Sequence, residues 1–482
     1  MFLLWFKGVK VIKTGFPVIH FYDQDFVDIY NKTWLWLGDF WKKGTKKNGF
    51  QNKYYCYPES TTINQYEACL STFFLVYSNA TYSPAPALDN FYNKQEDSGA
   101  IRGLYNEADG KAVFPKDNPE CLFPPLFAWA EFNIYHKVGL KKRLKEVIPV
   151  LERYYEWIES KFQQKNGLFK TPLSVAQMDN TPRDKAAYLI DFNSQMALNA
   201  YYMSAIGDIL NDKEISFKYK KKYYSLKTRI DALMWDEEDQ FYYDLNRSEE
   251  KVKVKTLASY WTMLAQIPSE DKAEALVQKL IDGPFSTENP FPSLATDSKA
   301  YNQNGKGYCG SVYPHLTFMV IKGLEKYNRH EFARECAIRH LYFMLDALNP
   351  DGNKPGELYE AYSPITGVPS KWEGKKNFPR KNFLSYAALS TITLMIENVI
   401  GLDISLPRKT VDWIIPLLEI MGIQDLSLKR NMITILVNKS GRGWEVRMES
   451  EKLYYFTINI LGGQKKRLPI PSGKCSILID KI

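Results

Sequence analysis

A long succession of amphipathic segments constrains the fold more than any other feature of this sequence. From about residue 26 to residue 400, apolar residues recur with helical spacing, most clearly from Arg143 to Phe162. Short and long connections alternate between roughly ten to twelve such segments. Such a run of paired helices predicts a mostly α fold, a solenoid closed into a toroid in which inner and outer helices alternate. The predicted helices cover residues 26–41, 60–77, 126–138, 143–162, 186–211, 214–235, 256–266, 271–282, 312–328, 330–347 and 383–400.

The periodicity changes at both ends of this helical part. From about residue 401, apolar and polar residues alternate in runs that glycine and proline separate, which is typical of strands. The runs cover residues 432–437, 444–448, 453–460 and 475–479. We therefore predict an N-terminal extended segment (1–25), a helical barrel (26–400) and a small antiparallel β domain (401–482) packed against the helices.

The long connections are the expected location of function. They cover residues 79–120, 167–185, 284–311 and 349–381. In a toroid one set of loops lines a central funnel, and polar loops on a rigid scaffold are a usual place for chemistry. Candidate functional residues are therefore sought in these loops.

The most concentrated polar loop is Met178-Asp179-Asn180-Thr181-Pro182-Arg183. Pro182 is disfavoured inside a helix, so this stretch lies before the helix predicted from residue 186. Ile190-Asp191-Phe192-Asn193 follows at the start of that helix. The loop combines an acid, an amide, a hydroxyl and a guanidinium. A structural alternative is an Asx-turn that starts the helix, with Arg183 paired to a nearby acid.

Two further stretches carry chemically useful side chains. The loop from Glu357 to Gly367 contains two carboxylates, Glu357 and Glu360, together with Tyr362. The stretch from Gly307 to His315 is rich in glycine, opens a helix, and places aromatic residues and a histidine at the helix start. It is no phosphate-binding loop, because lysine and serine or threonine are not at the required positions. An ordinary capped turn is the alternative for this stretch.

Two carboxylates on facing loops, among aromatic residues, match what the hydrolysis of a glycosidic bond needs. One carboxylic acid protonates the leaving oxygen, and one carboxylate activates water or attacks the anomeric carbon. Aromatic residues make up 15% of the chain, with 32 Tyr and 11 Trp, and such rings stack on sugars, although they also fill cores. A carbohydrate partner is therefore predicted, while the residue types alone do not identify the two acids.

Composition and charge exclude several other classes of function. The net charge of +8 is spread over 482 residues and gives no basic footprint for nucleic acid. The six cysteines form no CxxC pair and there are five histidines, so neither a zinc site nor a disulfide framework is expected. The apolar start from Met1 to Phe6 is too short for a signal peptide, and no later run is as long as a membrane span. We expect a cytoplasmic protein with no cofactor and no membrane partner.

Five sequence blocks resemble, in order, those of the six-hairpin glycosidases with an (α/α)6 barrel, near glycoside hydrolase family 63, the mannosylglycerate hydrolases and the trehalases. The blocks are Pro124 to Trp129 (similar to Q-P-P-L-L-A-W-A), Met178 to Arg183 ((S/G)-x-D-N-S-P-R), Ile190 to Asn193 (V-D-L-N), Gly310 to His315 (G-P-V-W-P-x) and Glu360 to Gly367 (E-x-Y-D-P-x-T-G). The resemblance implies an inverting hydrolase of an α-linked glucoside or related α-glycoside, with Asp179 as general acid and Glu360 as general base. Inversion implies carboxyl groups roughly 6.5–9.5 Å apart, and a general acid of this kind benefits from burial among aromatic residues.

The resemblance also implies a set of residues around the sugar. These are Arg102, Trp129, Asn180, Arg183, Asp191, Asn193, Tyr313, His315, Glu357 and Tyr362. Arg102 and Arg183 are expected to bind hydroxyls of the sugar. Asp191 and Asn193 are expected to shape the site or to cap their helix. Trp129 and Tyr313 line the sugar site or belong to the core. Glu357 is a rival of Glu360 for the role of base.

Several residues depart from the family pattern. Phe123 stands where relatives often carry Gln, Cys309 replaces the usual Arg, and Tyr313 replaces Trp. The G-W-S-x segment after the base loop is present only as Asn382-Phe383-Leu384-Ser385. These changes leave the sugar open and admit an inactive, glycan-binding relative. A sugar epimerase or polysaccharide lyase on the same toroid is another alternative, for which only His315 lies in a suitable loop.

Overall fold

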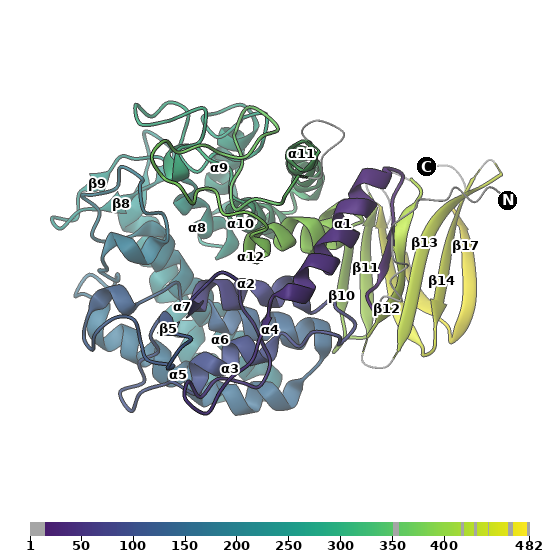
Figure 1. Cartoon of the computed structure of the whole chain (residues 1–482), viewed down its shortest axis with the longest axis horizontal. Helices are drawn as coiled ribbons and strands as arrows, with labels where there is room; N and C mark the ends of the chain where they lie inside the picture. Colours follow the sequence, from purple (N-terminus) through teal and green to yellow (C-terminus); the bar gives the residue numbers. More distant parts are fainter. Residues whose placement is uncertain are drawn as a thin grey trace.

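The computed structural model describes residues 15–349, 356–415, 419–428, 431–441, 443–460 and 466–479. Helices are the main regular structure of the first 400 residues, and strands form most of the remainder, as Figure 1 shows. Residues 1–14, which include most of the predicted N-terminal segment, lie outside the described ranges. The predicted mostly α fold with a C-terminal β part is confirmed.

Among the described residues, six inner helical elements form a closed ring. They are α2 (Gln65–Leu75), α4 (Phe127–Val138), α6 (Ile190–Leu210), α8 (Trp261–Leu264), α10 (Pro314–Lys326) and α12 (Leu384–Ala388), which continues as the π-helix η6 (Leu389–Val399). Each element contacts the next, and α12 and η6 contact α2, which closes the ring. Helices α10 and η6 bury nearly all of their side chains, as expected of helices surrounded by other helices.

The outer helices pack around this ring. They are α1 (Gln24–Trp36), α3 (Ala85–Tyr92), α5 (Lys141–Phe162), α7 (Lys213–Met234), α9 (Glu270–Ile281) and α11 (His330–Leu348). In α5 the predicted apolar stripe, which includes Leu144, Leu151 and Ile158, is buried and faces the ring, although Pro149 lies inside the helix. Helix α1 lies at the junction with the β part (Figure 1) and packs on η6 and α11.

The connections give the barrel two different ends. Those that follow inner helices are short: residues 139–140 after α4, 211–212 after α6 and 327–329 after α10. Gly139 and Asn211 end their helices in the left-handed conformation. Those that lead to the next inner helix are long, as in residues 163–189, 282–313 and 349–383. The amino termini of the inner helices therefore lie at a long-loop end, and their carboxyl termini lie at a short-loop end.

The predicted loop over residues 79–120 is partly wrong. It contains α3, the strand β5 (Leu104–Asn106), which pairs with β4 (Thr62–Asn64), and a 3-10 turn at Pro119–Cys121. Helix α3 has only 8 residues, and Pro86 stands in its first turn. A helix of two turns is too short to show a clear period in the sequence.

The strands of the β part form two larger sheets within the described ranges. One has the order β1–β12–β13–β14–β17, and the other has the order β10–β11–β15–β16. Their bounds are β1 Val18–His20, β10 Leu402–Ser405, β11 Thr410–Ile415, β12 Met421–Ser427, β13 Met432–Ser440, β14 Gly443–Ser450, β15 Tyr454–Ile460, β16 Lys466–Ile470 and β17 Gly473–Ile479. Pairing is antiparallel except between β11 and β15. Strand β1 pairs with β12, so Val18–His20 belong to this sheet.

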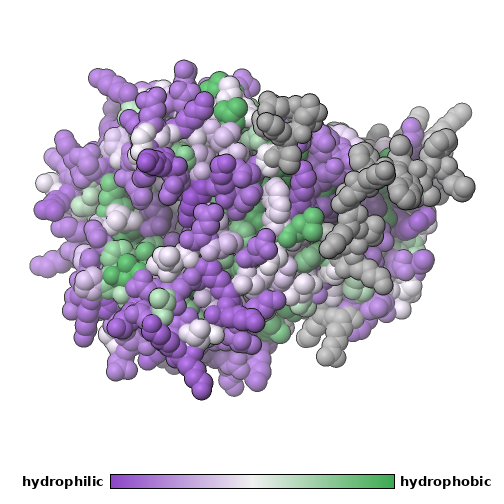
Figure 2. All heavy atoms as spheres, viewed as in Figure 1, coloured by the Kyte–Doolittle hydropathy of each residue, from purple (hydrophilic) through white to green (hydrophobic). Residues whose placement is uncertain are grey.

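The surface seen in Figure 2 is mostly hydrophilic, and hydrophobic residues gather only in small separate patches. No helix in the described ranges is long and apolar enough to cross a membrane.

A buried ion network ties the barrel to the β part. Glu397 of η6 forms ion pairs with Lys137 of α4 at 3.1 Å and with Lys322 of α10 at 2.8 Å, and it accepts a hydrogen bond from Tyr77. Lys137 also binds Asp403 of β10 at 2.8 Å. Burial opposes the charge of Glu397, but the two lysines outweigh it and lower the pKa of this carboxyl to about 2.

We expect Glu397→Gln to destabilise the fold by about 1–3 kcal/mol, because two buried lysines lose a charged partner. Since the folded pKa of Glu397 is below its ordinary value of 4.5, its contribution is complete above pH 4.5 and is lost as the pH falls towards 2. Urea unfolding at several pH values measures both effects. Glu335→Gln, at an exposed ion pair on α11, is the matched control. Equal stability loss in the two variants would contradict this role.

Candidate active site

Asn180 holds the loop of Asp179 against the loop that precedes α10. Its side-chain amide donates to the carbonyl oxygen of Lys306 at 2.7 Å, and its side-chain oxygen accepts from the backbone N–H of Tyr308 at 2.8 Å. The Cys309 thiol donates to the Asn180 carbonyl oxygen at 3.0 Å. Asn180 therefore positions Asp179 through three contacts that join segments far apart in the sequence.

The loop of Glu360 is attached to the same region by its backbone. Val312 and Tyr362 exchange two backbone hydrogen bonds of 2.9 Å each, two residues after Glu360. The Tyr362 hydroxyl is buried and accepts a hydrogen bond from the backbone N–H of Tyr359 at 2.9 Å. Residues 306–312 thus connect the Asp179 loop with the Glu360 loop at the long-loop end. The Tyr362 side chain therefore packs inside the Glu360 loop and is not exposed at its surface.

A pair of stacked tyrosines lies beside both carboxylates. The rings of Tyr308 and Tyr313 are 4.1 Å apart and inclined by 10°, and both side chains are buried. Burial raises the pKa of each phenol, and the negative charges of Glu360 and Asp179 raise it further. The charges of both acids therefore contribute to the raised pKa of the same two phenols.

The two acids differ in their surroundings. Asp179 is exposed, so the expected burial of this residue among aromatic side chains is not seen. The Glu360 side chain retains 12% of its accessible surface and forms an ion pair with Arg380. The rival carboxylate Glu357 instead pairs with the exposed Lys381 at 2.9 Å. Among the two glutamates of this loop, Glu360 is the one directed towards the tyrosine pair.

Arg380 binds both oxygens of Glu360. Its Nε and Nη2 atoms donate at 2.9 and 2.8 Å, and its backbone N–H donates at 3.2 Å. The guanidinium lies 3.5 Å from the ring centre of Phe383 and 3.7 Å from Glu67. Burial opposes its charge, but Glu360 and Glu67 outweigh this effect and raise the pKa of Arg380. The geometry of the Glu360 carboxylate is thus fixed in the plane of the guanidinium.

Glu67 is a third carboxyl at this end of the barrel. It lies in the first turn of α2 and accepts a hydrogen bond from the Ser385 hydroxyl of α12 at 2.8 Å. Ser385 is also 3.2 Å from the hydroxyl of Tyr55. Burial raises the pKa of Glu67. Glu67 therefore joins the first and last inner helices next to Arg380.

A buried group of three charges lies under the Asp179 loop. Arg183 binds Asp191 with two contacts of 3.1 Å, and it binds Asp244 at 2.6 and 2.8 Å. All three side chains are at most 2% exposed. Asp244 also accepts from the backbone N–H of Ile190, the first residue of α6. The N–H groups of Arg183 that face Asp191 and Asp244 all donate to these two acids. Arg183 is therefore paired with nearby acids, as in the structural alternative in which the loop is a turn that starts the helix.

Asn193 attaches the long loop before the Asp179 loop to α6. Its side chain accepts from the backbone N–H of Phe169 at 2.7 Å and donates to the carbonyl oxygen of the same residue at 3.1 Å. It also donates to the Leu189 carbonyl oxygen at 2.8 Å. Asn193 and Asp191 are therefore placed to shape the loops around the site.

Two residues predicted at the sugar site lie elsewhere. Arg102 forms an ion pair with Glu96 at 2.8 Å and donates to carbonyl oxygens of its own loop. Trp129 packs on Phe73 and Phe318, with ring centres 4.3 and 6.1 Å away, and lines a cavity towards the short-loop end. No described contact joins either residue to Asp179 or Glu360.

His315 lies beneath the tyrosine pair and not at its surface. It is 2% exposed, and the ring of Tyr386 covers it at 3.9 Å. Burial, with a smaller effect from Arg380, lowers its pKa well below 6.5. Within the described ranges its Nδ1 atom has no hydrogen-bond partner. A proton-carrying His315, as an epimerase or lyase needs, finds no support in this position.

The three residues that depart from the family pattern each contact another residue at the long-loop end. Phe123 packs on Gly103, where a Cβ atom would come within 1.8 Å of the ring. Cys309 binds Asn180, and Tyr313 stacks on Tyr308. Each replacement is thus built into the packing of the long-loop end.

Sequence reasoning missed Arg380, Glu67 and Trp372, and it assigned no role to Tyr308 within the stretch from Gly307 to His315. Arg380, Glu67 and Trp372 belong to no recognisable motif, and Glu67 and Arg380 are 313 positions apart. Glu67 follows Asn64, which caps the start of α2. This capping residue is the one local signal for Glu67 in the sequence, because it marks the start of an inner helix. Among the described residues, no group of three or more His, Cys, Asp or Glu is placed to hold a metal ion.

Two family descriptions match this chain. Residues 74–379 match the mannosylglycerate hydrolase MGH1-like glycoside hydrolase domain, and residues 401–482 match the trehalase C-terminal domain. A protein of Borreliella burgdorferi described as uncharacterized is 50% identical over 476 residues, which is 98% of this chain and 100% of that protein.

Two solved structures share the fold. A family 63 mannosylglycerate hydrolase from Thermus thermophilus, in complex with glucose, has a TM-score of 0.59 and 16% identity, over 76% of this chain and 99% of that chain. The neutral trehalase of Saccharomyces cerevisiae has a TM-score of 0.55 and 13% identity, over 71% and 72%. Both are glycosidases by name, and their barrels confirm the predicted (α/α)6 toroid.

The packing around Gly307 makes the loop clamp testable. This residue has φ +63°, and an added Cβ would lie 2.7 Å from the Asn180 oxygen and from the Trp372 ring. We expect Gly307→Ala to displace the Asp179 loop and lower kcat/KM about 100-fold, since a shift of about 1 Å costs that much. Gly441→Ala is the control, because Gly441 has φ +60° and no atom within 4 Å. Equal activity in both variants would show that the clamp does not position Asp179.

Proposed function

Because this chain belongs to the mannosylglycerate hydrolase MGH1-like glycoside hydrolases, we propose that it hydrolyses an α-linked glycoside with inversion. In this proposal Asp179 is the general acid and Glu360 is the general base. The supporting observation is that two acids 181 positions apart lie on loops that residues 306–312 connect at the long-loop end of the barrel.

The different surroundings of the two acids suit different roles. Asp179 is exposed, so a leaving group next to it would remain in contact with solvent. It would give its proton to the glycosidic oxygen. Glu360 lies deeper, and two hydrogen bonds from Arg380 fix the orientation of its carboxylate. It would take a proton from the water that attacks the anomeric carbon on the opposite face, so an α-glycoside would release a β-sugar.

Two half-buried aromatic residues, Phe378 and Trp372, would provide a surface for the glycone. Their ring centres are 5.7 Å apart, and Phe378 packs on the buried Tyr313, which stacks on Tyr308. Aromatic faces suit the apolar face of a pyranose ring. The names of the relatives make glucosides, mannosides, trehalose and mannosylglycerate the first compounds to test.

We expect Asp179→Asn and Glu360→Gln each to lower kcat by roughly 10²–10⁴-fold, which is the usual contribution of general acid or base catalysis. Glu357→Gln is a matched control, because Glu357 lies in the same loop and pairs with Lys381. Rates are measured by sugar release, and thermal unfolding verifies that each variant folds. Full activity in Asp179→Asn and Glu360→Gln would refute the assignment. A loss confined to Glu357→Gln would transfer the role of base to Glu357.

The stereochemistry of the product is the second test. A proton NMR time course on a panel of α-glucosides and α-mannosides, trehalose included, should show the β-anomer first. An α-anomer first would exclude the mechanism with a water between two carboxylates. If sugars bind in calorimetry and none is released, the chain is a glycan-binding relative, and the replacements Phe123, Cys309 and Tyr313 are the residues to revert.

A further inference from the structure

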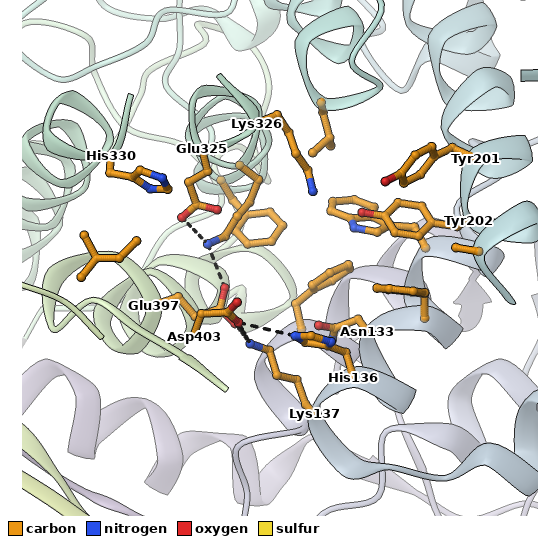
Figure 3. Close-up of a pocket in the computed structure, with 18 of the residues that line it drawn as sticks. Asn133, His136, Lys137, Tyr201, Tyr202, Glu325, Lys326, His330, Glu397 and Asp403 are labelled. Atoms are coloured by element: carbon orange, nitrogen blue, oxygen red, sulfur yellow. Dashed lines mark hydrogen bonds and ion pairs between the residues drawn. The ribbon is translucent and has the colours of Figure 1, made fainter. Parts of the chain in front are cut away.

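A second cavity lies at the other end of the inner helices. Its volume is about 350 Å³, and it opens between the short-loop end of the barrel and the β part (Figure 3). Its charged barrel residues come from the last turns of inner helices, such as His136 of α4, Lys326 of α10 and Glu397 of η6, whereas Trp129 and Phe318 come from the first half of their helices. Asp403 and Arg408 of the β part complete its wall.

One side of this cavity is aromatic. Trp129 and Phe318 are stacked with ring centres 6.1 Å apart, and Phe73 packs on Trp129 at 4.3 Å. Tyr201 and Tyr202 lie on the same side, with their rings towards the cavity in Figure 3. Flat aromatic surfaces beside a few polar groups are typical of sites for small polar ligands with an apolar face.

The cavity also carries more cations than its acids neutralise. Lys137 forms ion pairs with Glu397 and Asp403 (Figure 3), and Lys322 forms ion pairs with Glu325 and Glu397. The acids are Glu325, Glu397 and Asp403. Two further cations, Lys326 and Arg408, are exposed and form no ion pair with any described residue. The cavity therefore holds four permanent positive charges and three negative ones, together with His136 and His330.

Lys326 has a distinctive position among these cations. It is the last residue of α10, and in Figure 3 its amino group points into the cavity, towards Tyr202. A lysine at a helix carboxyl terminus is also favoured by the helix dipole, which is its structural explanation. That explanation does not cover Arg408, which follows β10 in the β part. Two unrelated segments thus bring cations without a described acidic partner to one cavity.

We propose that this cavity binds a small anionic sugar, a monosaccharide that carries a phosphate or a carboxylate group. The pyranose ring would rest on Tyr201, a half-buried aromatic residue of the cavity, and the anion would meet Lys326 and Arg408. Hydroxyls of the sugar have Asn133, Tyr201 and Tyr202 as partners. The volume lies near the lower limit for ligand pockets, roughly 300–1,000 Å³, which suits one sugar ring better than a chain.

This site is separate from the candidate active site. Helix α10 starts next to Tyr313, with His315 in its first turn, whereas Lys322 and Lys326 lie in its last turns. At 1.5 Å per residue, the proposed anion-binding residue Lys326 lies about 18 Å along α10 from Pro314, whereas the aromatic residue Phe318 lies about 6 Å from it. The proposal therefore does not depend on which residues catalyse hydrolysis.

The test is isothermal titration calorimetry on the full chain. Glucose 6-phosphate and glucuronate are the probes, and glucose and inorganic phosphate are the comparison ligands. We expect at least one anionic sugar to bind more tightly than glucose and than phosphate, with an affinity that falls as salt rises. The stronger of the two probes distinguishes a phosphate from a carboxylate.

Variants locate the site. We expect Lys326→Ala and Arg408→Ala each to weaken binding about tenfold, since each removes one charged contact. Lys161→Ala is the matched control, because Lys161 is an exposed lysine in the last turn of α5, away from the cavity. Asp179→Asn should leave the affinity unchanged, and thermal unfolding verifies the fold of each variant.

Three results would overturn the proposal. The first is an absence of binding by both anionic sugars, and the second is glucose or phosphate binding as tightly as they do. The third is binding that Asp179→Asn removes and Lys326→Ala does not, which would place the ligand at the long-loop end. A failure of hydrolysis in the activity assays has no bearing on these outcomes, so the two proposals fail independently.

Discussion

Closure of the ring of inner helices is the constraint on which the rest of this structure depends. When α12 packs against α2, the last inner helix meets the first, and the apolar sides of all six elements become buried together. The same closure brings Ser385 to Glu67, and it sets the loops of Asp179 and Glu360 at one end. A functional site made of residues from so many parts of the chain exists only in the closed ring.

Much of the polar chemistry at the long-loop end is structural. Arg183 with its two aspartates, Asn180 with its three contacts and Asn193 with Phe169 all fix loop backbones. Buried charges are costly unless they are paired, and each of these groups has its partners. A motif such as D-N-T-P-R therefore combines one exposed acid with neighbours that hold it in place, and only the contacts reveal which residue has which task.

The sequence predicted the helical ring well and the site only in part. Periodicity identified long helices such as α5, because a buried stripe repeats along them, but it missed the two-turn helix α3. Polar loops near Asp179 and Glu360 were found from local composition. Arg380 was not, because its meaning comes from a contact with Glu360, which no local pattern encodes. The same limit explains why Trp129, next to a family-like motif, lies in a different cavity.

The pairing of β1 with β12 has a mechanical consequence. The chain crosses between the β part and the barrel twice, once from β1 into α1 and once from η6 into β10. Domains joined by a single linker are free to swing about it. Two connections at different places restrict this rotation, because the β part can no longer turn about a single linker. The β part is therefore held in a fixed position against the short-loop end of the barrel, and the cavity between them keeps a constant shape.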